Sequence, residues 1–206
     1  MKTLVALAAL LLTLNACGSD GEDAATDPGP AGDSPAMPTD PPVPSGQVRS
    51  AHLATVMDTG TPELCLGPVA ESYPPQCGGP AITNWDWAQH GHDMFDEQGD
   101  IRWGTFAVTG TWDGTAFEVS ETVPGPLYDA PAVEPSTMPT PAASYSEAEL
   151  EAVATEVRDL PGAQGSYSNG TTVTAEVMYD DGSLQAWADE EYGAGVVLVS
   201  SLLVDA

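Results

Sequence analysis

Four side chains in the segment WAQHGHDMFDEQGD, residues 87–100, have types and spacings that metal binding uses: His90, His92, Asp93 and Met94. In an extended backbone alternate side chains share a face, which would place His90, His92 and Met94 together. Two imidazoles and a thioether suit copper, and two imidazoles with a carboxylate equally suit zinc. The alternative interpretation is an exposed acidic loop whose histidines bind nothing.

Two cysteines, Cys65 and Cys77, bracket the proline-rich segment CLGPVAESYPPQC. A zinc site would need four ligands in close pairs, and a thioredoxin-type redox centre would need C-x-x-C, but neither pattern occurs here. If the chain is exported and Cys17 is used elsewhere, the two remaining cysteines favour a disulfide. Closing a loop of about 13 residues would contribute roughly 3 kcal/mol by the chain-entropy model.

No catalytic group can be assembled from spacing alone. The sequence contains no G-x-S-x-G, no phosphate-binding loop and no H-E-x-x-H. The neighbouring carboxylates Asp180 and Asp181 are more typical of a turn and a helix cap than of acid–base chemistry. We therefore predict no enzymatic activity, and no cofactor apart from the metal considered above.

The N-terminus, MKTLVALAALLLTLNAC, has one lysine, a short apolar run and small residues before Cys17. The run would be about 16 Å long as a helix, too short for a bilayer core of about 30 Å. This plan predicts a secretory signal peptide over residues 1–16. The final Leu-Asn-Ala-Cys resembles the bacterial lipobox, which implies cleavage before Cys17 and its acylation, although an ordinary secretory signal is the alternative. Two or three acyl chains anchor a protein stably where one does not.

The segment 17–47 is rich in proline and acidic residues and has no aromatic residue. It cannot bury enough apolar surface to offset the entropy of ordering, so we predict a disordered tether. The whole chain has 4 Lys and Arg residues against 31 Asp and Glu residues, for a net charge of −27. Nucleic acid and anionic headgroups repel such a polyanion, so we expect no nucleic-acid partner.

Residues 48–121 are predicted to form a small all-β domain. Its two longest apolar segments, RWGTFAVTGTW and TAFEVSE, flank Asp113-Gly114, a pair typical of a two-residue hairpin turn. Five short strands in this length suggest a closed or nearly closed OB-like barrel. In RWGTFAVTGTW, Phe106, Val108 and Trp112 share one face of the strand, and three threonines share the other: Thr105, Thr109 and Thr111.

A proline-rich linker is expected over 122–144, before a second domain over 145–206. Ser146 and Glu149 match a capping box at the start of a helix. A strand in TTVTAEVMY and a helix in SLQAWADEEYG should follow. The segment VVLVSSLLV is apolar on both faces and is expected to be a central strand.

The predicted fold class is therefore α+β. A small five-stranded OB-like β-barrel is followed by a small helix–strand–helix–strand sandwich, and a signal peptide and a disordered tether precede both.

Three pieces of the chain, LCLGPVAESYPPQCGGP, WGTFAVTGTWDG and YDDGSLQAWADEEYG, are together similar to a group of uncharacterised actinobacterial lipoproteins. The likeness covers most of residues 48–206, and the cysteine loop is its most specific part. It implies a secreted, lipid-anchored protein with a disulfide-bonded Cys65–Cys77 loop, and it implies no activity.

These features predict a lipoprotein anchored in the cell membrane, on its extracytoplasmic face, that acts as a binding or interaction module. Its partner would be an envelope protein or a small ligand. The alternative function is the binding of copper or zinc by the loop that carries His90 and His92.

Overall fold

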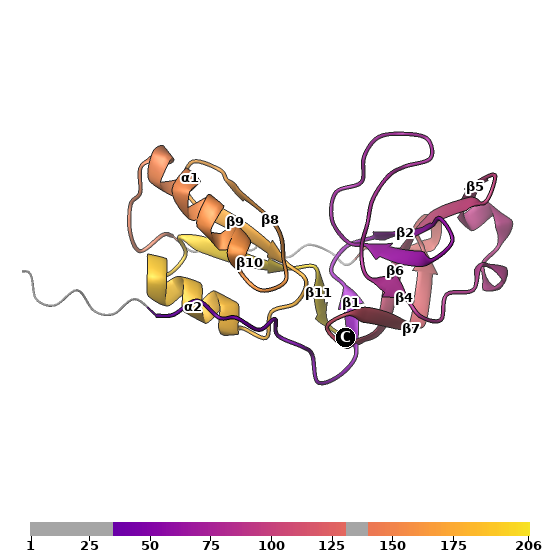
Figure 1. The fold of residues 1–206 in the computed structure, drawn as a ribbon, viewed down its shortest axis with the longest axis horizontal. Coiled ribbons are helices and arrows are strands. Elements are labelled where there is room, and N and C mark those ends of the chain that lie inside the picture. Colours follow the sequence, from indigo (N-terminus) through magenta and orange to yellow (C-terminus); the bar gives the residue numbers. More distant parts are fainter. Residues whose placement is uncertain (1–34, 131–139) are drawn as a thin grey trace, which may run out of the picture. The chain divides into compact units, whose positions relative to one another are not determined.

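The computed structural model describes residues 35–130 and 140–206 (Figure 1). The predicted signal peptide, the predicted lipidation site Cys17 and the larger part of the predicted tether lie outside these residues. The described chain forms two β-sheets and two α-helices. None of the helices within these ranges is long and apolar enough to cross a membrane.

The first sheet contains eight strands, seven from the first half of the described chain and one from its end. The strands are β1 (Val48–Ser50), β2 (Ala54–Asp58), β3 (Pro62–Cys65), β4 (Ala81–Ile82), β5 (Asp96–Gln98), β6 (Ile101–Trp112), β7 (Ala116–Pro124) and β11 (Leu203–Asp205). Short 3-10 helices lie between or after them: η1 (Trp87–Gln89), η2 (His92–Met94) and η3 (Gly125–Leu127).

Five of these strands close into a barrel. The order is β6-β2-β3-β4-β7, and β7 pairs back onto β6. All neighbours are antiparallel except β4 and β7, which are parallel. Numbered by their place in the chain, the barrel strands follow the ring order 1-2-3-5-4, which is that of an OB-like barrel. The predicted fold class is confirmed.

Strand β6 supplies much of the barrel interior. Its side chains alternate as predicted, with Phe106, Val108 and Trp112 buried and Thr105 exposed. At Gly110 the pairing with β7 shifts register, and a Cβ atom there would lie 2.1 Å from the Glu118 carbonyl oxygen. Only glycine fits that approach, so Gly110 allows one long strand to pair along its length while it curves.

The β6–β7 hairpin turns one residue later than predicted. The N–H of Asp113 donates to the carbonyl oxygen of Ala116, so the two loop residues are Gly114 and Thr115. Gly114 has a φ of 95°, which glycine adopts without strain. Oδ1 of Asp113 accepts from the N–H groups of Thr115 and Ala116, each at 2.8 Å, and these bonds lower the pKa of Asp113. The aspartate therefore holds the turn with its side chain instead of lying within it.

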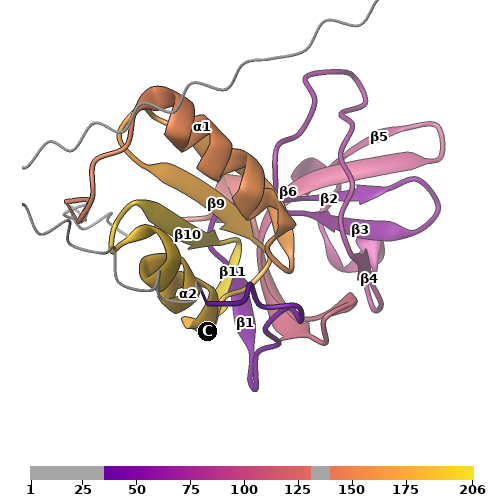
Figure 2. The same ribbon diagram turned by 60° about the vertical axis from the view of Figure 1, so that its left-hand side comes forward.

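The second sheet has the order β10-β9-β8 and is packed against both helices (Figure 2). Its elements are α1 (Glu147–Glu156), η4 (Val157–Asp159), β8 (Ala163–Ser168), β9 (Val173–Val177), α2 (Ser183–Tyr192) and β10 (Val197–Ser201). The predicted capping box is present, since Ser146 accepts from the Glu149 N–H and the Glu149 carboxylate accepts from the Ser146 N–H. The polar strand β8 adds a third strand to the two that were predicted.

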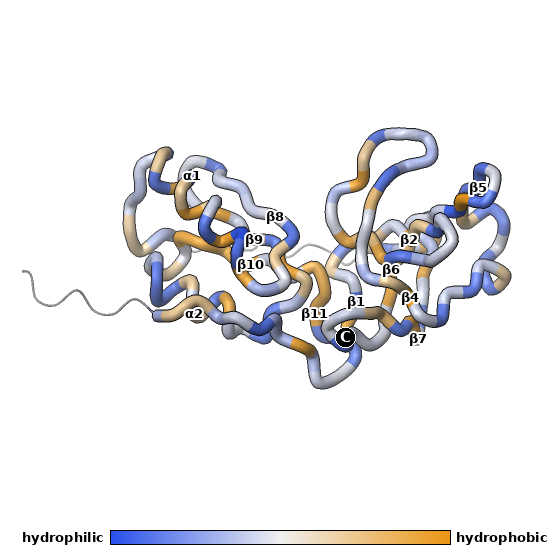
Figure 3. Tube along the Cα trace, in the orientation of Figure 1, coloured by the Kyte–Doolittle hydropathy of each residue, from blue (hydrophilic) through white to orange (hydrophobic). Residues whose placement is uncertain are grey.

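The segment VVLVSSLLV does not form one central strand, so that prediction is wrong. Its first part is β10 at an edge of the second sheet, and β9 is central. The chain then leaves that sheet at Leu202, and β11 pairs antiparallel with β1 of the first sheet. The segment is apolar on both faces because it serves two cores, with Val197 in one and Leu203 in the other. Figure 3 shows the apolar stretch that runs from β10 toward β11.

Residues 35–47, the described part of the predicted tether, have neither helix nor strand. Even so, Met37 packs against the core of the second sheet, and the indole N–H of Trp187 donates to the Pro35 carbonyl oxygen at 3.1 Å. The composition of this segment did not indicate these contacts, because only a few residues of a polar, proline-rich stretch make them.

Candidate ligand-binding site

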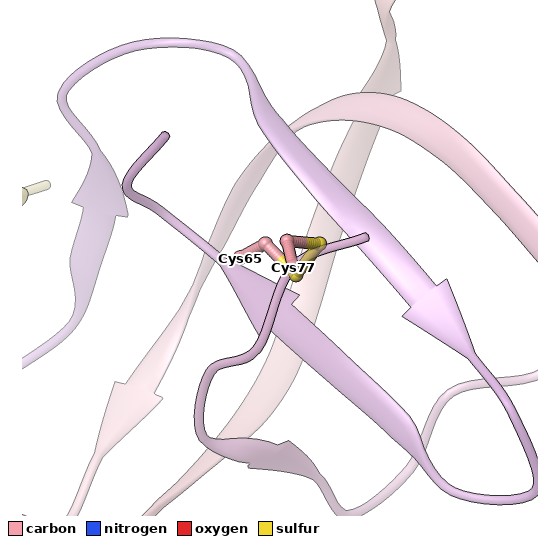
Figure 4. Close-up of a disulfide and its surroundings, with 2 residues drawn as sticks. All are labelled: Cys65 and Cys77. Atoms are coloured by element: carbon pink, nitrogen blue, oxygen red, sulfur yellow. A yellow bond between two sulfur atoms is a disulfide. The ribbon is translucent and has the colours of Figure 1, made fainter. Parts of the chain in front are cut away.

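The disulfide lies beside the barrel, at the end of β3. Cys65 and Cys77 are bonded, with an S–S distance of 2.08 Å and a Cα–Cα distance of 5.9 Å (Figure 4). This confirms the predicted pair. Cys65 is buried with Met57 and Trp103, and exposed Tyr73 of the intervening loop meets the Trp103 ring edge-on at 5.2 Å. The bond therefore fixes a loop onto the barrel wall, which is a structural role.

The connection from β4 to β5 carries the residues predicted to bind metal. It is not extended, as that prediction assumed, because it contains two 3-10 helices. The carboxylate of Asp86 caps the first by accepting from the N–H of Ala88 at 2.9 Å. The second, η2, includes His92 and Met94. The simple alternation that would have aligned His90, His92 and Met94 is therefore absent.

His90 lies within a cluster of aromatic rings. Its imidazole stacks on the Trp85 indole, with ring centroids 4.6 Å apart and planes 20° apart. The ring of Phe106, fully buried in the barrel, lies 4.9 Å away. Burial lowers the pKa of His90 below its usual 6.5, with the nearby Asp86 carboxylate acting in the opposite direction. His90 is therefore largely neutral at pH 7.

A pocket of about 390 Å³, which we call the aromatic–histidine pocket, opens next to His90. It is lined by Trp87, Ala88, His90, His92, Phe95, Glu97 and Arg102. Trp87 is buried, its N–H donates to the Asp58 carboxylate at 2.8 Å, and its ring lies 4.8 Å from that of Phe95. These contacts give the pocket a fixed apolar surface.

Two charged side chains complete the aromatic–histidine pocket. Glu97 on β5 and Arg102 on β6 are directly opposite each other in the antiparallel register. Both are exposed. The pair therefore places a strong acceptor and a multiple donor beside the aromatic rings.

A second, smaller pocket of about 140 Å³, the polar pocket, also has His90 in its lining. Its lining is Asn84, Trp85, Asp86, Gln89, His90, Val119, Ser120, Glu121 and Thr122. The Asn84 amide donates to the Val119 carbonyl oxygen at 2.7 Å and accepts from the Val119 N–H at 2.9 Å. This bidentate contact ties the start of the connection to β7 and so fixes Trp85 between barrel and solvent.

Comparison of this chain with protein-family models, with curated proteins and with solved structures finds no match. The similarity to actinobacterial lipoproteins therefore stays a prediction. The site has to be interpreted from its own geometry.

The predicted metal ligands are only partly brought together. His90 and His92 line the same pocket, whereas Asp93 and Met94 are not part of its lining. Among the residues that the structure describes, no three His, Cys, Asp or Glu side chains are grouped as metal ligands would be. A metal site at these residues stays a prediction, with two of its four ligands in one place.

Sequence reasoning missed the other half of the site. Glu97, Arg102 and Glu121 come from strands, and strand pairing brings them near the histidines. The one signal available in the sequence was the scarcity of basic residues, since Arg102 is among only 4 Lys and Arg residues in the chain. The paired carboxylates behave as predicted: Asp180 accepts from the N–H groups of Gly182 and Leu184, and Asp181 accepts from that of Ser183, so together they shape the start of α2.

Proposed function

We propose that this protein is an extracytoplasmic, lipid-anchored binding module that holds a small ligand in the aromatic–histidine pocket. The pocket itself is the observation that carries the proposal. Its volume of about 390 Å³ falls in the range of small-molecule sites, roughly 300–1,000 Å³. Its lining combines aromatic rings with a few polar groups, which is the composition that orients a ligand.

The scaffold under the pocket supports binding without large rearrangement. Trp87 is fixed by its hydrogen bond to Asp58 on β2, and Phe95 directly precedes β5, which pairs with β6. Arg102 lies on β6, which pairs with β2 and β5 and, further along, with β7. Side chains that hydrogen bonds and strand pairing already hold in place lose little conformational entropy when a ligand binds.

The anchor rests on the sequence. The short apolar run and the lipobox-like Leu-Asn-Ala-Cys support acylation of Cys17. With the disulfide, which persists in oxidising surroundings, they support a place outside the cytoplasm.

Metal binding is a second candidate, favoured by one observation: His90 and His92 line the same pocket. Either copper or zinc would accept two imidazoles, with further ligands from solvent or from a bound molecule. Metal analysis of protein purified without a histidine tag tests this, and His92→Ala should abolish the metal content. Metal-free protein that also fails to bind added Zn²⁺ or Cu²⁺ would remove this candidate.

The binding function is tested by ¹H–¹⁵N NMR of residues 35–206 against a fragment library. We expect hits whose chemical-shift changes cluster on the backbone of residues 84–106. Arg102→Ala should weaken those hits. Arg158→Ala removes the same charge from the second domain, where Arg158 donates to Ser166, and should leave them unchanged. No hits, or hits that cluster elsewhere, would contradict the proposal.

A further inference from the structure

The His90 side chain is part of the lining of both pockets. Its ring is stacked on Trp85, which lines the polar pocket, while Trp87 and Phe95 line the aromatic–histidine pocket. The two pockets therefore adjoin at one aromatic wall, which we call the Trp85–His90 stack. A ligand longer than one ring can contact both sides of this wall.

The polar pocket offers hydrogen bonds but little apolar surface. Glu121 and Gln89 are exposed, and Thr122 is half-buried. Together they present a carboxylate, an amide and a hydroxyl group, which both accept and donate. Such a set matches a ligand that carries several hydroxyl groups.

The aromatic–histidine pocket offers the complementary chemistry. Half-buried Phe95, packed against the buried Trp87 ring, provides ring surface on which the C–H face of a sugar ring can lie. Glu97 and Arg102 then lie at the side, an acceptor and a donor opposite each other across β5 and β6. A pyranose presents that combination, with an apolar face and hydroxyl groups around its edge.

The charge of the chain and of the two pockets disfavours an anionic ligand. The chain carries a net charge of −27, and Asp86, Glu97 and Glu121 line the two pockets, so a polyanion such as nucleic acid is repelled. Arg102 is the one Lys or Arg residue in the two linings, and Glu97 faces it across β5 and β6, so this pair adds no net charge to the aromatic–histidine pocket. A neutral, polyhydroxylated ligand does not meet the repulsion that a polyanion meets.

We propose that the ligand is a neutral oligosaccharide, with neighbouring sugar units on either side of the Trp85–His90 stack. This inference rests on the proposed binding function and names its ligand class. One unit lies on Phe95, beside Trp87, in the aromatic–histidine pocket. The next lies in the polar pocket, with its hydroxyl groups hydrogen-bonded to Glu121 and its neighbours.

The test is titration of the full-length protein with neutral sugar hexamers, monitored by tryptophan fluorescence, because Trp85 and Trp87 border the pockets. The probes are cello-, malto-, manno-, xylo- and chitohexaose, each compared with its monomer and with an acidic control, oligogalacturonate. We expect at least one neutral hexamer to bind about tenfold or more tightly than its monomer, and oligogalacturonate not to bind.

Two variants locate the sugar units. Arg102→Ala in one pocket and Glu121→Ala in the other should each weaken binding of that hexamer about tenfold. Arg158→Ala and Glu118→Ala are the matched controls, because neither residue lines these two pockets and Glu118 is exposed on β7. Both should bind as the unmodified protein does. Thermal melts of all four verify that they are folded.

Three results would overturn the inference: no neutral hexamer binds at millimolar concentration, oligogalacturonate binds better, or Glu121→Ala has no effect. Failure of the inference and failure of the proposed function give different results. Fragments that bind the aromatic–histidine pocket while every sugar fails would leave the binding module standing and remove the oligosaccharide. Failure of both fragments and sugars would remove both.

Discussion

The His90 ring is in contact with aromatic rings on more than one side, so protonating it costs more free energy in the folded protein than in the unfolded chain. Burial lowers its pKa in the folded protein, whereas the unfolded chain keeps a value near 6.5. The unfolded state therefore takes up the proton first as the pH falls. Stability from this group is complete above about pH 6.5 and is lost as the pH falls through the lower folded-state pKa.

This predicts a pH-dependent difference between the protein and its His90→Gln variant. Between about pH 7.5 and pH 5.5 the unmodified protein should lose more of its free energy of unfolding than the variant does. Urea denaturation at several pH values measures this. The Asp86 carboxylate acts against burial by raising the pKa of His90, so it reduces this difference without reversing it. Parallel pH profiles would show that His90 does not titrate differently on folding.

The disulfide is the second residue-scale test. Replacing Cys65 and Cys77 together by serine should lower the free energy of unfolding by roughly 3 kcal/mol, because the loop of about 13 residues is no longer closed in the unfolded chain. Denaturation of the double variant, with and without reductant, provides the measurement. Reductant should destabilise the unmodified protein to a similar extent and leave the variant unchanged. An equal stability of both proteins would contradict the structural role.

At the scale of elements, the start of α1 depends on one local motif. Ser146→Ala removes the hydroxyl that accepts from the Glu149 N–H, and we expect a loss of about 1 kcal/mol. Thr155→Ala is a suitable control, since its hydroxyl bonds within the same helix to the Glu151 carbonyl, which already belongs to the helix. A cost at Ser146 no larger than that at Thr155 would mean that tertiary packing alone holds the helix.

Elements defined by local pattern could be predicted from the sequence. Alternation gave the buried face of β6, and the spacing of Ser146 and Glu149 gave the start of α1. An element that exists only through pairing could not. Strand β5, with the sequence DEQ, is exposed throughout, so it has no hydrophobic period to detect.

The same distinction between local patterns and strand pairing applies to the candidate site. The histidines were visible as a local cluster, because they are two positions apart in the chain. Arg102 and Glu121 were not, since each reaches its pocket through strand register, a non-local property. The 3-10 helices were also not predicted. Asp86 ends the extended stretch by accepting a hydrogen bond from the Ala88 N–H, and the alternation of side chains along the sequence does not reveal this bond.

For the whole molecule, the proposed anchor gives a direct prediction. Cys17→Ala removes the thiol that would carry the first acyl chain, so the protein should appear in the medium or remain unprocessed instead of in the membrane fraction. Fractionation followed by mass spectrometry of the N-terminus checks this. Replacement of Cys65 and Cys77 together by serine, which leaves Cys17 in place, is the control and should leave membrane retention intact. Correctly cleaved Cys17→Ala protein that stays in the membrane would contradict the anchor.

The pairing of β11 with β1 predicts how the described chain unfolds. Leu203 is fully buried in the barrel core, although its segment comes directly from the second sheet. Leu203→Ala should cost about 2–5 kcal/mol and should lower the stability of both sheets in a single transition. Hydrogen exchange of β6 and β9 amides reports each sheet separately. Val204→Ala, at a half-buried neighbour, should cost less, and destabilisation confined to one sheet would contradict the coupling.

The same pairing also affects the time at which the fold can form. Strand β1 meets β11 across about 150 residues of chain, and a ribosome adding 5–20 residues per second needs roughly 8–30 s to make them. During that interval β1 has no partner on its β11 side, and the segment that continues from β10 is still missing. Translation therefore leaves the eight-stranded sheet without its last strand until residues 203–205 have been made, although the five strands that close the barrel are already present.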